Sequence, residues 1–431
     1  MTPRLPRRRL ALSMALVLAA PAALAVEGAQ DDPRHADPVE LATVEVRATP
    51  LADTAEDLAL PVEVLAGERL DRAKASSLGE TVNKLPGVQS SNFGPGVGRP
   101  IVRGFDGARV QVLSDGLGSG DVSTVSVDHA VSIEPFLAEQ IEVLKGPATL
   151  LYGSGAIGGA VNVIDGRVPE RLTAEPLEGR AELRAGSVNV ERTGMLRVDG
   201  STDAFAFHFD ALHREAGDVE IPGFAESAAH RAEQGEAPDP AGAGVLSNSF
   251  VRTDSAALGA SWIGDGAFVG GAYSLFSNRY GVPGHAHAHA EEHEEEEGHD
   301  EAGVDIALDQ RRTELRGGID RLGPFESLRL KLANTQYTHT EFEGREIGTV
   351  FDNDSREARL ELVHAPLAGW KGAFGLQWGA REFLAVGERC ARSSPRLRCM
   401  ASLAFHFNAA DTLVVSKSRS GPIATAASTS T

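Results

Sequence analysis

The chain of 431 residues contains only two cysteines, Cys390 and Cys399, both near the C-terminus. Two thiols at this spacing form neither a disulfide-rich scaffold nor a zinc knuckle. Basic residues are also scarce, because 41 Lys and Arg oppose 61 Asp and Glu and leave a formal net charge of −20. A nucleic-acid partner is therefore not expected, since no basic stripe can neutralise phosphates, whereas attraction of cations is favoured.

Long apolar runs are absent after the first residues, and no later segment has the ~18 uncharged apolar residues of a spanning helix. The start, MTPRLPRRRLALSMALVLAAPAALA, has a basic beginning, an apolar stretch and a small-residue Ala-Leu-Ala end. This pattern predicts a secretory signal peptide over residues 1–25. An exported chain without apolar helices crosses a membrane only as a β-barrel, and otherwise it is soluble.

Residues 26–60 are polar and rich in Asp and Pro, so we expect them to be disordered. Within them, LATVEVRATP holds a short β-prone run at Thr43, Val44, Glu45 and Val46. An extended segment near a free terminus can add as a strand to the sheet edge of a partner. On composition alone, an edge strand of the following domain is an equal alternative.

Residues 61–169 have the pattern of a compact α/β domain. The stretch ERLDRAKASSLGETVNKLPGV has helical spacing up to its Pro-Gly stop, and RPIVRGFDGARVQVLSDGL reads as two strands joined by a turn at Asp106-Gly107. The spacing Gly153-x-Gly155-x-x-Gly158 matches a dinucleotide fingerprint by letter, but that fingerprint needs a following helix, and the strand-like AVNVI follows. The glycines are therefore assigned to tight turns rather than to a nucleotide site.

Residues 179–386 alternate between apolar and polar side chains in about nine candidate strands. In AFAFHFDALH, for example, three Phe alternate with Ala206, His208 and Asp210. Such alternation over ~10 residues is typical of an outer-membrane barrel strand, although a soluble sandwich has the same period. His208 and His213 fall on opposite faces and are not expected to chelate together.

The connections between these strands differ in length. Short turns at IGDGA, LGPFE and APLAGW alternate with long polar connections at roughly 215–250, 280–310 and 342–354. This alternation favours a barrel threaded through a membrane, with the long loops outside the cell.

The long connection over residues 285–301 reads HAHAHAEEHEEEEGHDE and holds five His and eight acidic residues. Imidazole nitrogens and carboxylate oxygens are zinc ligands, and imidazoles favour Zn²⁺, Ni²⁺ or Cu²⁺ over Ca²⁺ or Mg²⁺. The candidate ligands are His285, His287, His289, His293, His299, Glu291 and Glu292. Because the His-Ala alternation fixes no geometry, the pattern predicts a flexible capture site. The alternative is a solvated acidic loop with incidental His.

Three segments, LPGVQS, RPIVRGFDGARVQVLSDGL and IEPFLAEQIEVLKGPATLLYGSGAIGGAVNVI, resemble in order and spacing the plug signature of TonB-dependent outer-membrane receptors. The resemblance implies an α/β plug domain followed by an antiparallel transmembrane β-barrel, which in this family has about twenty-two strands. It also implies a place in the lipid of a Gram-negative outer membrane. The energy-coupling partner is then TonB of the inner membrane, bound through Thr43, Val44, Glu45 and Val46.

Two further stretches resemble the zinc-uptake (ZnuD-like) subfamily. These are STVSVDHAVSIEP, with Asp128 and His129, and YTHTEFEGREIGT, with His339 and Glu341. The resemblance implies that these four residues bind the metal below the external loop and that zinc is the transported ligand. No cofactor, catalytic residue or enzymatic activity is expected. Because the plug signature is shared across substrates, a haem or metal-chelate receptor is the alternative substrate class.

The chain departs from the family pattern in its second half. About nine strands are fewer than half of the family's barrel, so we expect an incomplete, curved sheet. Residues 387–431 hold six Lys and Arg against two acids, together with both cysteines. We therefore expect a truncation or reading-frame change to have produced an aberrant non-barrel tail, and a non-transporting remnant is a third interpretation.

Overall fold

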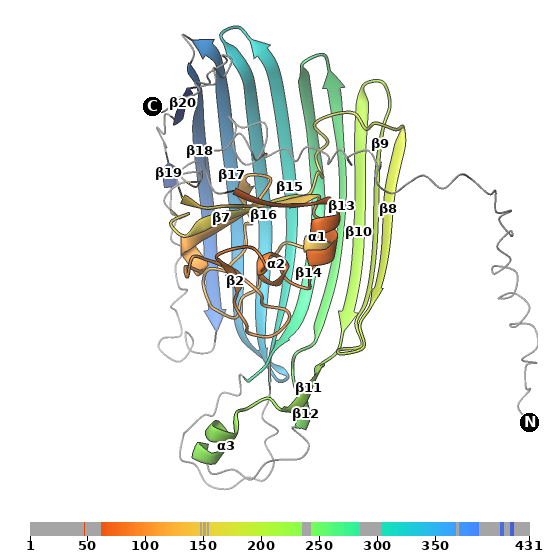
Figure 1. The fold of residues 1–431 in the computed structure, drawn as a ribbon, viewed down its shortest axis with the longest axis vertical. Helices are drawn as coiled ribbons and strands as arrows, with labels where there is room; N and C mark the ends of the chain where they lie inside the picture. The colour runs from red at the N-terminus through yellow and green to blue at the C-terminus, as the bar shows by residue number, and fades with distance from the viewer. Residues whose placement is uncertain are drawn as a thin grey trace, which may run out of the picture. The chain divides into compact units, whose positions relative to one another are not determined.

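The computed structural model describes residues 47, 62–146, 149, 152, 155–234, 243–284, 303–367, 370–387, 406–408 and 414–417. Val44–Thr431 form one compact unit, and only this unit contains described residues. Two parts can be distinguished within it, a small N-terminal domain and a large sheet of long strands that run side by side (Figure 1).

The N-terminal domain is built on a small sheet with the strand order β1-β6-β7-β4-β5, in which β4 and β7 are parallel and the other neighbours antiparallel. Its strands are β1 (Val62–Ala66), β4 (Val110–Ser114), β5 (Leu117–Gly118), β6 (Gln140–Leu144) and β7 (Gly159–Ile164). A separate pair consists of β2 (Val88–Ser90) and β3 (Pro100–Val102). The strand predicted over AVNVI is therefore present, as part of β7.

The predicted helical stretch forms two short helices, α1 (Gly67–Ala73) and α2 (Leu78–Val82). The break comes at Ser77, which has an extended backbone and whose side chain accepts a hydrogen bond from the backbone N–H of Glu80. A serine oxygen satisfies a free N–H at a helix start, so Ser77 begins a new helix instead of continuing the first.

The core of this domain lies between the helices and one face of the sheet. Leu70, Leu78 and Val82 of the helices pack with Val143 and Val161 of the sheet, and all five are almost completely buried. Burial of such side chains stabilises each by about 1.5–3 kcal/mol. Val131 of the segment 119–134 belongs to the same core, and Ile133 packs against it.

The two strands predicted on either side of Asp106-Gly107 are present as β3 and β4, and a turn joins them, but they do not pair with each other. β3 pairs with β2, while β4 pairs with β5 and β7, and Gly107–Arg109 form a 3₁₀ turn between β3 and β4. Gly107 has a φ of +56°, which favours glycine. The two strands enter different sheets because each has apolar partners of its own.

The large sheet is antiparallel throughout and contains nine long strands among the described residues, as the sequence predicts. They are β8 (Leu177–Ala185), β9 (Arg192–Ser201), β10 (Phe205–Ala216), β13 (Val251–Gly264), β14 (Ala267–Val282), β15 (Val304–Leu322), β16 (Phe325–Glu343), β17 (Glu346–Leu367) and β18 (Trp370–Gly387). Two short strands, β19 (His406–Asn408) and β20 (Val414–Lys417), pair with β18, and the rest of the expected tail after residue 387 lies outside the described residues.

Two of the three predicted long connections are present. The first, after β10, carries the pair β11 (Val219–Phe224) and β12 (Ala243–Leu246) and the helix α3 (Ala228–Gln234), which project from one end of the sheet in Figure 1. The second joins β14 to β15 and contains the His-rich segment, of which residues 285–302 lie outside the described residues.

The third, expected over residues 342–354, is wrong, because β16 and β17 continue to a tight turn at Gly344 and Arg345. Its polar residues Asp352 and Asp354 are exposed side chains of β17, so polarity here marks the surface of a strand rather than a loop.

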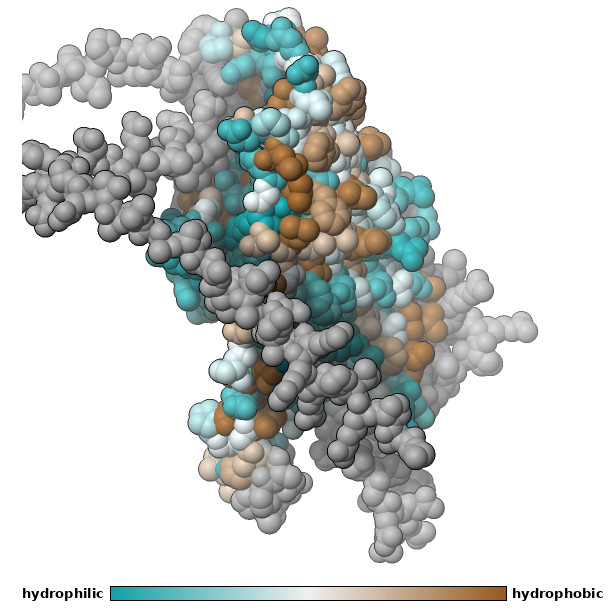
Figure 2. Space-filling view, turned by 90° about the vertical axis from the view of Figure 1, so that its right-hand side faces the viewer, coloured by the Kyte–Doolittle hydropathy of each residue, from teal (hydrophilic) through white to brown (hydrophobic). Residues whose placement is uncertain are grey.

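The strands of the large sheet bury polar side chains and expose apolar ones. In β10, His208, Asp210 and Arg214 are buried, while Phe205 and Phe207 are 60% and 42% exposed. This order reverses that of a soluble sandwich and is typical of a strand that contacts lipid outside and a polar lumen inside. Hydrophobic side chains gather over the upper half of the molecule in the side view of Figure 2.

Many of the outward apolar side chains lie close together on neighbouring strands of the sheet. They include Leu258, Trp262, Val269, Tyr273, Leu275, Leu315, Ile319, Leu330, Phe374 and Leu376, all exposed. Toward the connections after β10 and β14, the same face carries Asp254, Asp309 and Asp352. Among the described helices, none has the length and hydrophobicity needed to cross a membrane.

Candidate metal centre

His129 lies in the loop between β5 and the 3₁₀ turn Pro135–Leu137, on the side of the N-terminal domain that faces the large sheet. His339 and Glu341 lie on β16, two residues apart. Because side chains of a strand alternate between its faces, this spacing directs both toward the same face. The structure thus brings together three residues from two segments that are more than 200 positions apart, as the separation of 212 between His129 and Glu341 shows.

The three side chains are close enough to share one ion. Nε2 of His129 lies 3.0 Å from Oε1 of Glu341, and Nε2 of His339 lies 3.9 Å from the same oxygen. The two imidazole rings are 4.1 Å apart at their centroids. Ligand atoms bound to one zinc at 2.0–2.1 Å with tetrahedral angles are about 3.3 Å apart. The observed separations straddle that value.

The hydrogen bond of Nδ1 decides which ring nitrogen of His129 carries the proton. Nδ1 lies 3.1 Å from the carbonyl oxygen of Val122, which can only accept, so Nδ1 donates. In the neutral imidazole, Nε2 then presents a lone pair toward the carboxylate of Glu341. Two acceptors at 3.0 Å repel each other, so this contact needs either a proton between the two side chains, carried by His129 or by Glu341, or a cation. A carbonyl behind a ligating histidine is a common arrangement at metal sites.

The ring of His339 is held by a tyrosine and a phenylalanine. Its Nδ1 is hydrogen-bonded to the hydroxyl of Tyr337 at 2.9 Å, and the ring packs edge-on against Phe351 with centroids 5.4 Å apart. Its Nε2 is buried without a hydrogen-bond partner among the described residues. A buried polar atom without a partner is rare, and it requires an explanation such as an ion. This nitrogen is directed into the same group as His129 and Glu341.

The burial of the group limits what can bind there. The side chains of His129 and His339 are fully buried, and that of Glu341 is 23% exposed. The three ligand atoms lie within 4.8 Å of one another. Such a compact set suits a bare divalent cation, which three ligands would hold with one coordination position left over, and it offers no slot for a large planar chelate.

Of the predicted ligands, His129, His339 and Glu341 are brought together, whereas Asp128 is not part of this group. The carboxylate of Asp128 instead accepts a hydrogen bond from Ser126. The loop ligands His285, His287, His289, His293, His299, Glu291 and Glu292 and the segment Thr43, Val44, Glu45 and Val46 lie outside the described residues.

His208 and His213 lie on opposite faces of β10, buried and exposed respectively, as their odd separation predicts. His208 bonds Asp199 and Asp210, and His213 bonds Asp254.

Sequence reasoning missed the residues that support the site. Tyr280 and Tyr337 are buried at 0% and 2% exposure and contact the histidine segments, yet neither stands out by spacing or by neighbouring letters. The YTHTE stretch carried one available signal, because Tyr337, His339 and Glu341 are three successive positions on one strand face.

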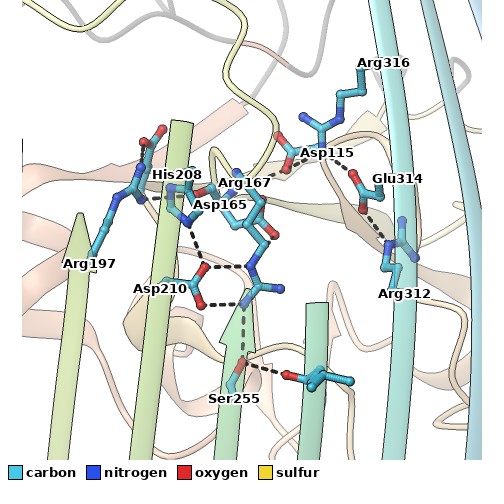
Figure 3. A network of polar contacts seen from close by, with 12 residues as sticks. Asp115, Asp165, Arg167, Arg197, His208, Asp210, Ser255, Arg312, Glu314 and Arg316 are labelled. Atoms are coloured by element: carbon cyan, nitrogen blue, oxygen red, sulfur yellow. Dashed lines mark hydrogen bonds and ion pairs between the residues drawn. The ribbon is translucent and has the colours of Figure 1, made fainter. Parts of the chain in front are cut away.

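A second polar cluster joins the N-terminal domain to the sheet (Figure 3). Arg167 donates to both oxygens of Asp210 at 2.9 and 3.2 Å, and Asp210 also contacts His208. Farther along, Arg316 of β15 contacts Asp115 at 3.0 Å and also pairs with Glu314. Buried charges require such partners, so the network holds the N-terminal domain against the large sheet.

Two carboxyls of the N-terminal domain in this network differ in protonation. Burial would raise the pKa of Asp115, but the adjacent charge of Arg316 outweighs it and holds that pKa well below the usual value. Burial raises the pKa of Asp165 to about 7, and the negative charge of Asp115 adds to this effect. Near neutral pH the pair therefore holds one negative charge and a second carboxyl that is partly protonated.

Residues 54–160 match the family model described as the TonB-dependent Receptor Plug Domain. The N-terminal domain is thus similar to this plug domain, and it is called the plug domain below. The vitamin B12 transporter BtuB of Photobacterium profundum is 34% identical over 120 residues, which cover 28% of this chain and 20% of the transporter.

Solved structures with a similar fold include the copper transporter OprC, with a TM-score of 0.59, 19% identity and coverage of 76% of this chain and 47% of that chain. Another is the FrpB iron transporter of Neisseria meningitidis, with a TM-score of 0.58, 14% identity and coverage of 76% and 49%. The chain thus spans about half the length of these transporters. The relatives are transporters rather than enzymes, which agrees with the prediction that this chain is not an enzyme.

The comparisons support the fold class of a plug domain with a large antiparallel sheet like that of receptor barrels.

Proposed function

We propose that this chain is part of an outer-membrane receptor that imports a divalent transition metal, zinc, with energy supplied through TonB. The observation that carries the proposal is the group His129, His339 and Glu341, which joins the plug domain to the inward face of β16. Two imidazoles and one carboxylate are a known zinc ligand set with one position open. That open position would allow an ion to arrive and leave.

The location of the group suits a transporter. His129 belongs to the plug domain and His339 to the large sheet, so a bound ion would bridge the two. Any displacement of the plug domain would separate His129 from Glu341 and so weaken binding. The coordination would thus be tied to the same movement that opens a path.

The membrane location is supported by the side chains of the long strands. They expose Phe, Leu and Trp on the outward face and bury charged residues toward the plug domain. The connection with the His-rich segment joins β14 to β15 at the end where the outward face becomes charged. In the proposed cycle, residues 285–301 capture metal outside the cell, and the segment Thr43–Val46 binds TonB.

The proposed substrate is a bare ion rather than haem or another metal chelate. The two histidine rings are fully buried and only 4.1 Å apart, so no porphyrin fits between them. Copper(II) remains a competitor for the same ligands, since it binds nitrogen and oxygen donors more tightly than zinc does. The preference between the two metals is therefore a quantity to measure.

Calorimetric titration of the purified full chain with Zn²⁺ tests the proposal. We expect two classes of site, a weaker class that disappears when residues 285–301 are replaced by a Gly-Ser linker and a tighter one that remains. His129→Ala or His339→Ala should abolish the tighter class, because two ligands seldom hold zinc. His213→Ala is the matched control, since its imidazole lies on the outward face.

A tighter class that survives both histidine substitutions would contradict the site. Binding of haem without binding of zinc would favour the alternative substrate class. A folded barrel resists unfolding by detergent until it is heated, and the folded and unfolded forms migrate differently on a gel. A shift in gel migration on heating would therefore argue against a non-transporting remnant.

A further inference from the structure

Tyr280 connects the His-rich connection with the plug domain. It lies two residues before the end of β14, and its side chain is completely buried. The described residues end shortly after it, at 284. Its ring packs against Gly96 of the plug domain so closely that a Cβ at Gly96 would lie 2.5 Å from the Cβ of Tyr280. The tyrosine is thus enclosed by the plug domain rather than merely facing it.

The hydroxyl of Tyr280 holds the backbone on both sides of His129. It donates to the carbonyl oxygen of Asp128 at 3.0 Å and accepts from the backbone N–H of Ala130 at 2.9 Å. Both peptide groups adjoin His129, whose position relative to Glu341 depends on them. A phenylalanine would keep the packing but leave both groups without this partner.

The same end of β14 is tied to the start of β15. Nδ2 of Asn248 donates to the carbonyl oxygens of Val282 and Val304, at 3.3 and 2.9 Å. These two valines border the connection that carries the His-rich segment, so Asn248 closes its base.

Val282 and Val304 also join an apolar cluster with Tyr280 and with Val122 and Ala130 of the plug domain. Val122 supplies the carbonyl oxygen that accepts from His129. The base of the connection and the backbone around His129 are therefore parts of one packed unit.

We propose that Tyr280 is a positioning residue of the metal centre, which fixes His129 through the two flanking peptide groups and so couples the centre to the base of the His-rich connection. The inference rests on the proposed function and deepens it, because it identifies how the external segment can regulate the inner site. A displacement of the ends of β14 and β15 that border this connection would reach His129 through Tyr280.

The test uses the purified full chain as wild type, Tyr280→Phe and Tyr273→Phe. Tyr273 is the matched control, because it lies on the same strand but is 47% exposed on the outward face. Zn²⁺ titration gives the affinity of the tighter class, and the visible absorption of bound Co²⁺ reports the coordination geometry. We expect Tyr280→Phe to weaken Zn²⁺ about 10–100-fold, the effect typical of residues behind metal ligands, and to change the Co²⁺ spectrum. Tyr273→Phe should change neither.

The outcomes separate the inference from the function on which it rests. If the wild type binds Zn²⁺ and Tyr280→Phe binds it equally with the same Co²⁺ spectrum, the positioning role is overturned while the site stands. If the wild type has no tighter class, both fall.

Should Tyr280→Phe fail to fold, Asn248→Gly decides. Asn248 has a φ of +57°, which glycine adopts without strain, so this variant removes only the side chain. A smaller loss of affinity supports the coupling, and an unchanged affinity refutes it.

Discussion

The buried ion pair between Arg214 of β10 and Glu134 of the plug domain gives a prediction about how firmly the two parts are joined. The guanidinium donates to both carboxylate oxygens at 2.9 and 3.0 Å. The two side chains are 0% and 3% exposed. Arg214 also lies over the ring of Phe136 at 4.6 Å. Removing the cation would leave a buried carboxylate without its charged partner.

The substitution Arg214→Met should therefore lower the free energy of plug-domain opening by about 3–5 kcal/mol, as for other buried pairs that lose one member. When exchange follows the opening equilibrium, that range corresponds to roughly 10²–10⁴-fold faster exchange of the amides that this opening exposes. Hydrogen exchange of the Ala130 amide measures it, because this N–H of the plug domain donates to the hydroxyl of Tyr280 in the large sheet. Adding Glu134→Gln should recover part of the loss, since it removes the buried charge.

Arg252→Met is the matched control, because its ion pair with Glu215 joins neighbouring strands on the exposed face, with side chains 58% and 56% exposed. An exposed pair contributes only about 0–1 kcal/mol. If Arg214→Met accelerates exchange no more than Arg252→Met does, the interpretation of Arg214 as an anchor of the plug domain is refuted.

Three further predictions follow from other parts of the molecule. The pKa of Asp165 is raised from an ordinary 3.8 to about 7 in the folded chain. Between about pH 4 and 7 the unfolded chain therefore loses this proton while the folded chain keeps it, so the contribution of Asp165 to the free energy of unfolding falls as pH rises. Asp165→Asn should therefore gain stability relative to wild type at pH 8 but not at pH 4, and equal melting shifts at both would contradict this. Leu258→Arg, on the outward face, should cost about 2–4 kcal/mol in bilayers, and a negligible cost would argue against lipid contact. Zn²⁺ binding of the weaker class, which is assigned to residues 285–301, should weaken below roughly pH 6 as imidazoles protonate, so an unchanged affinity of that class at pH 5 would exclude histidine ligands there.

The sequence predicts the large sheet well because each strand is specified by a local period. The alternation in β10 places His208 inside and Phe207 outside without reference to any distant residue. The sequence does not predict which strands pair, because the pairing partner of a strand is not encoded in its own local period. The strands β3 and β4 are visible in the letters, yet their pairing in different sheets depends on apolar partners elsewhere.

The metal centre shows the same division. His339 and Glu341 share a face by spacing alone, but their proximity to His129 depends on how the plug domain packs against β16. The role of Tyr280 could not be predicted, since its hydroxyl contacts backbone atoms 150 and 152 positions away. Asp128 was expected beside His129 as a ligand, yet adjacent residues of a loop diverge, and its carboxylate turns to Ser126.

The most direct test of the account is X-ray absorption at the zinc edge on the full chain in which residues 285–301 are replaced by a Gly-Ser linker. The account predicts one retained zinc with two imidazole nitrogens and carboxylate oxygen at 2.0–2.2 Å. The imidazole signal should be lost in His129→Ala. A zinc shell of oxygen alone, or a spectrum that His129→Ala leaves unchanged, would contradict the metal centre.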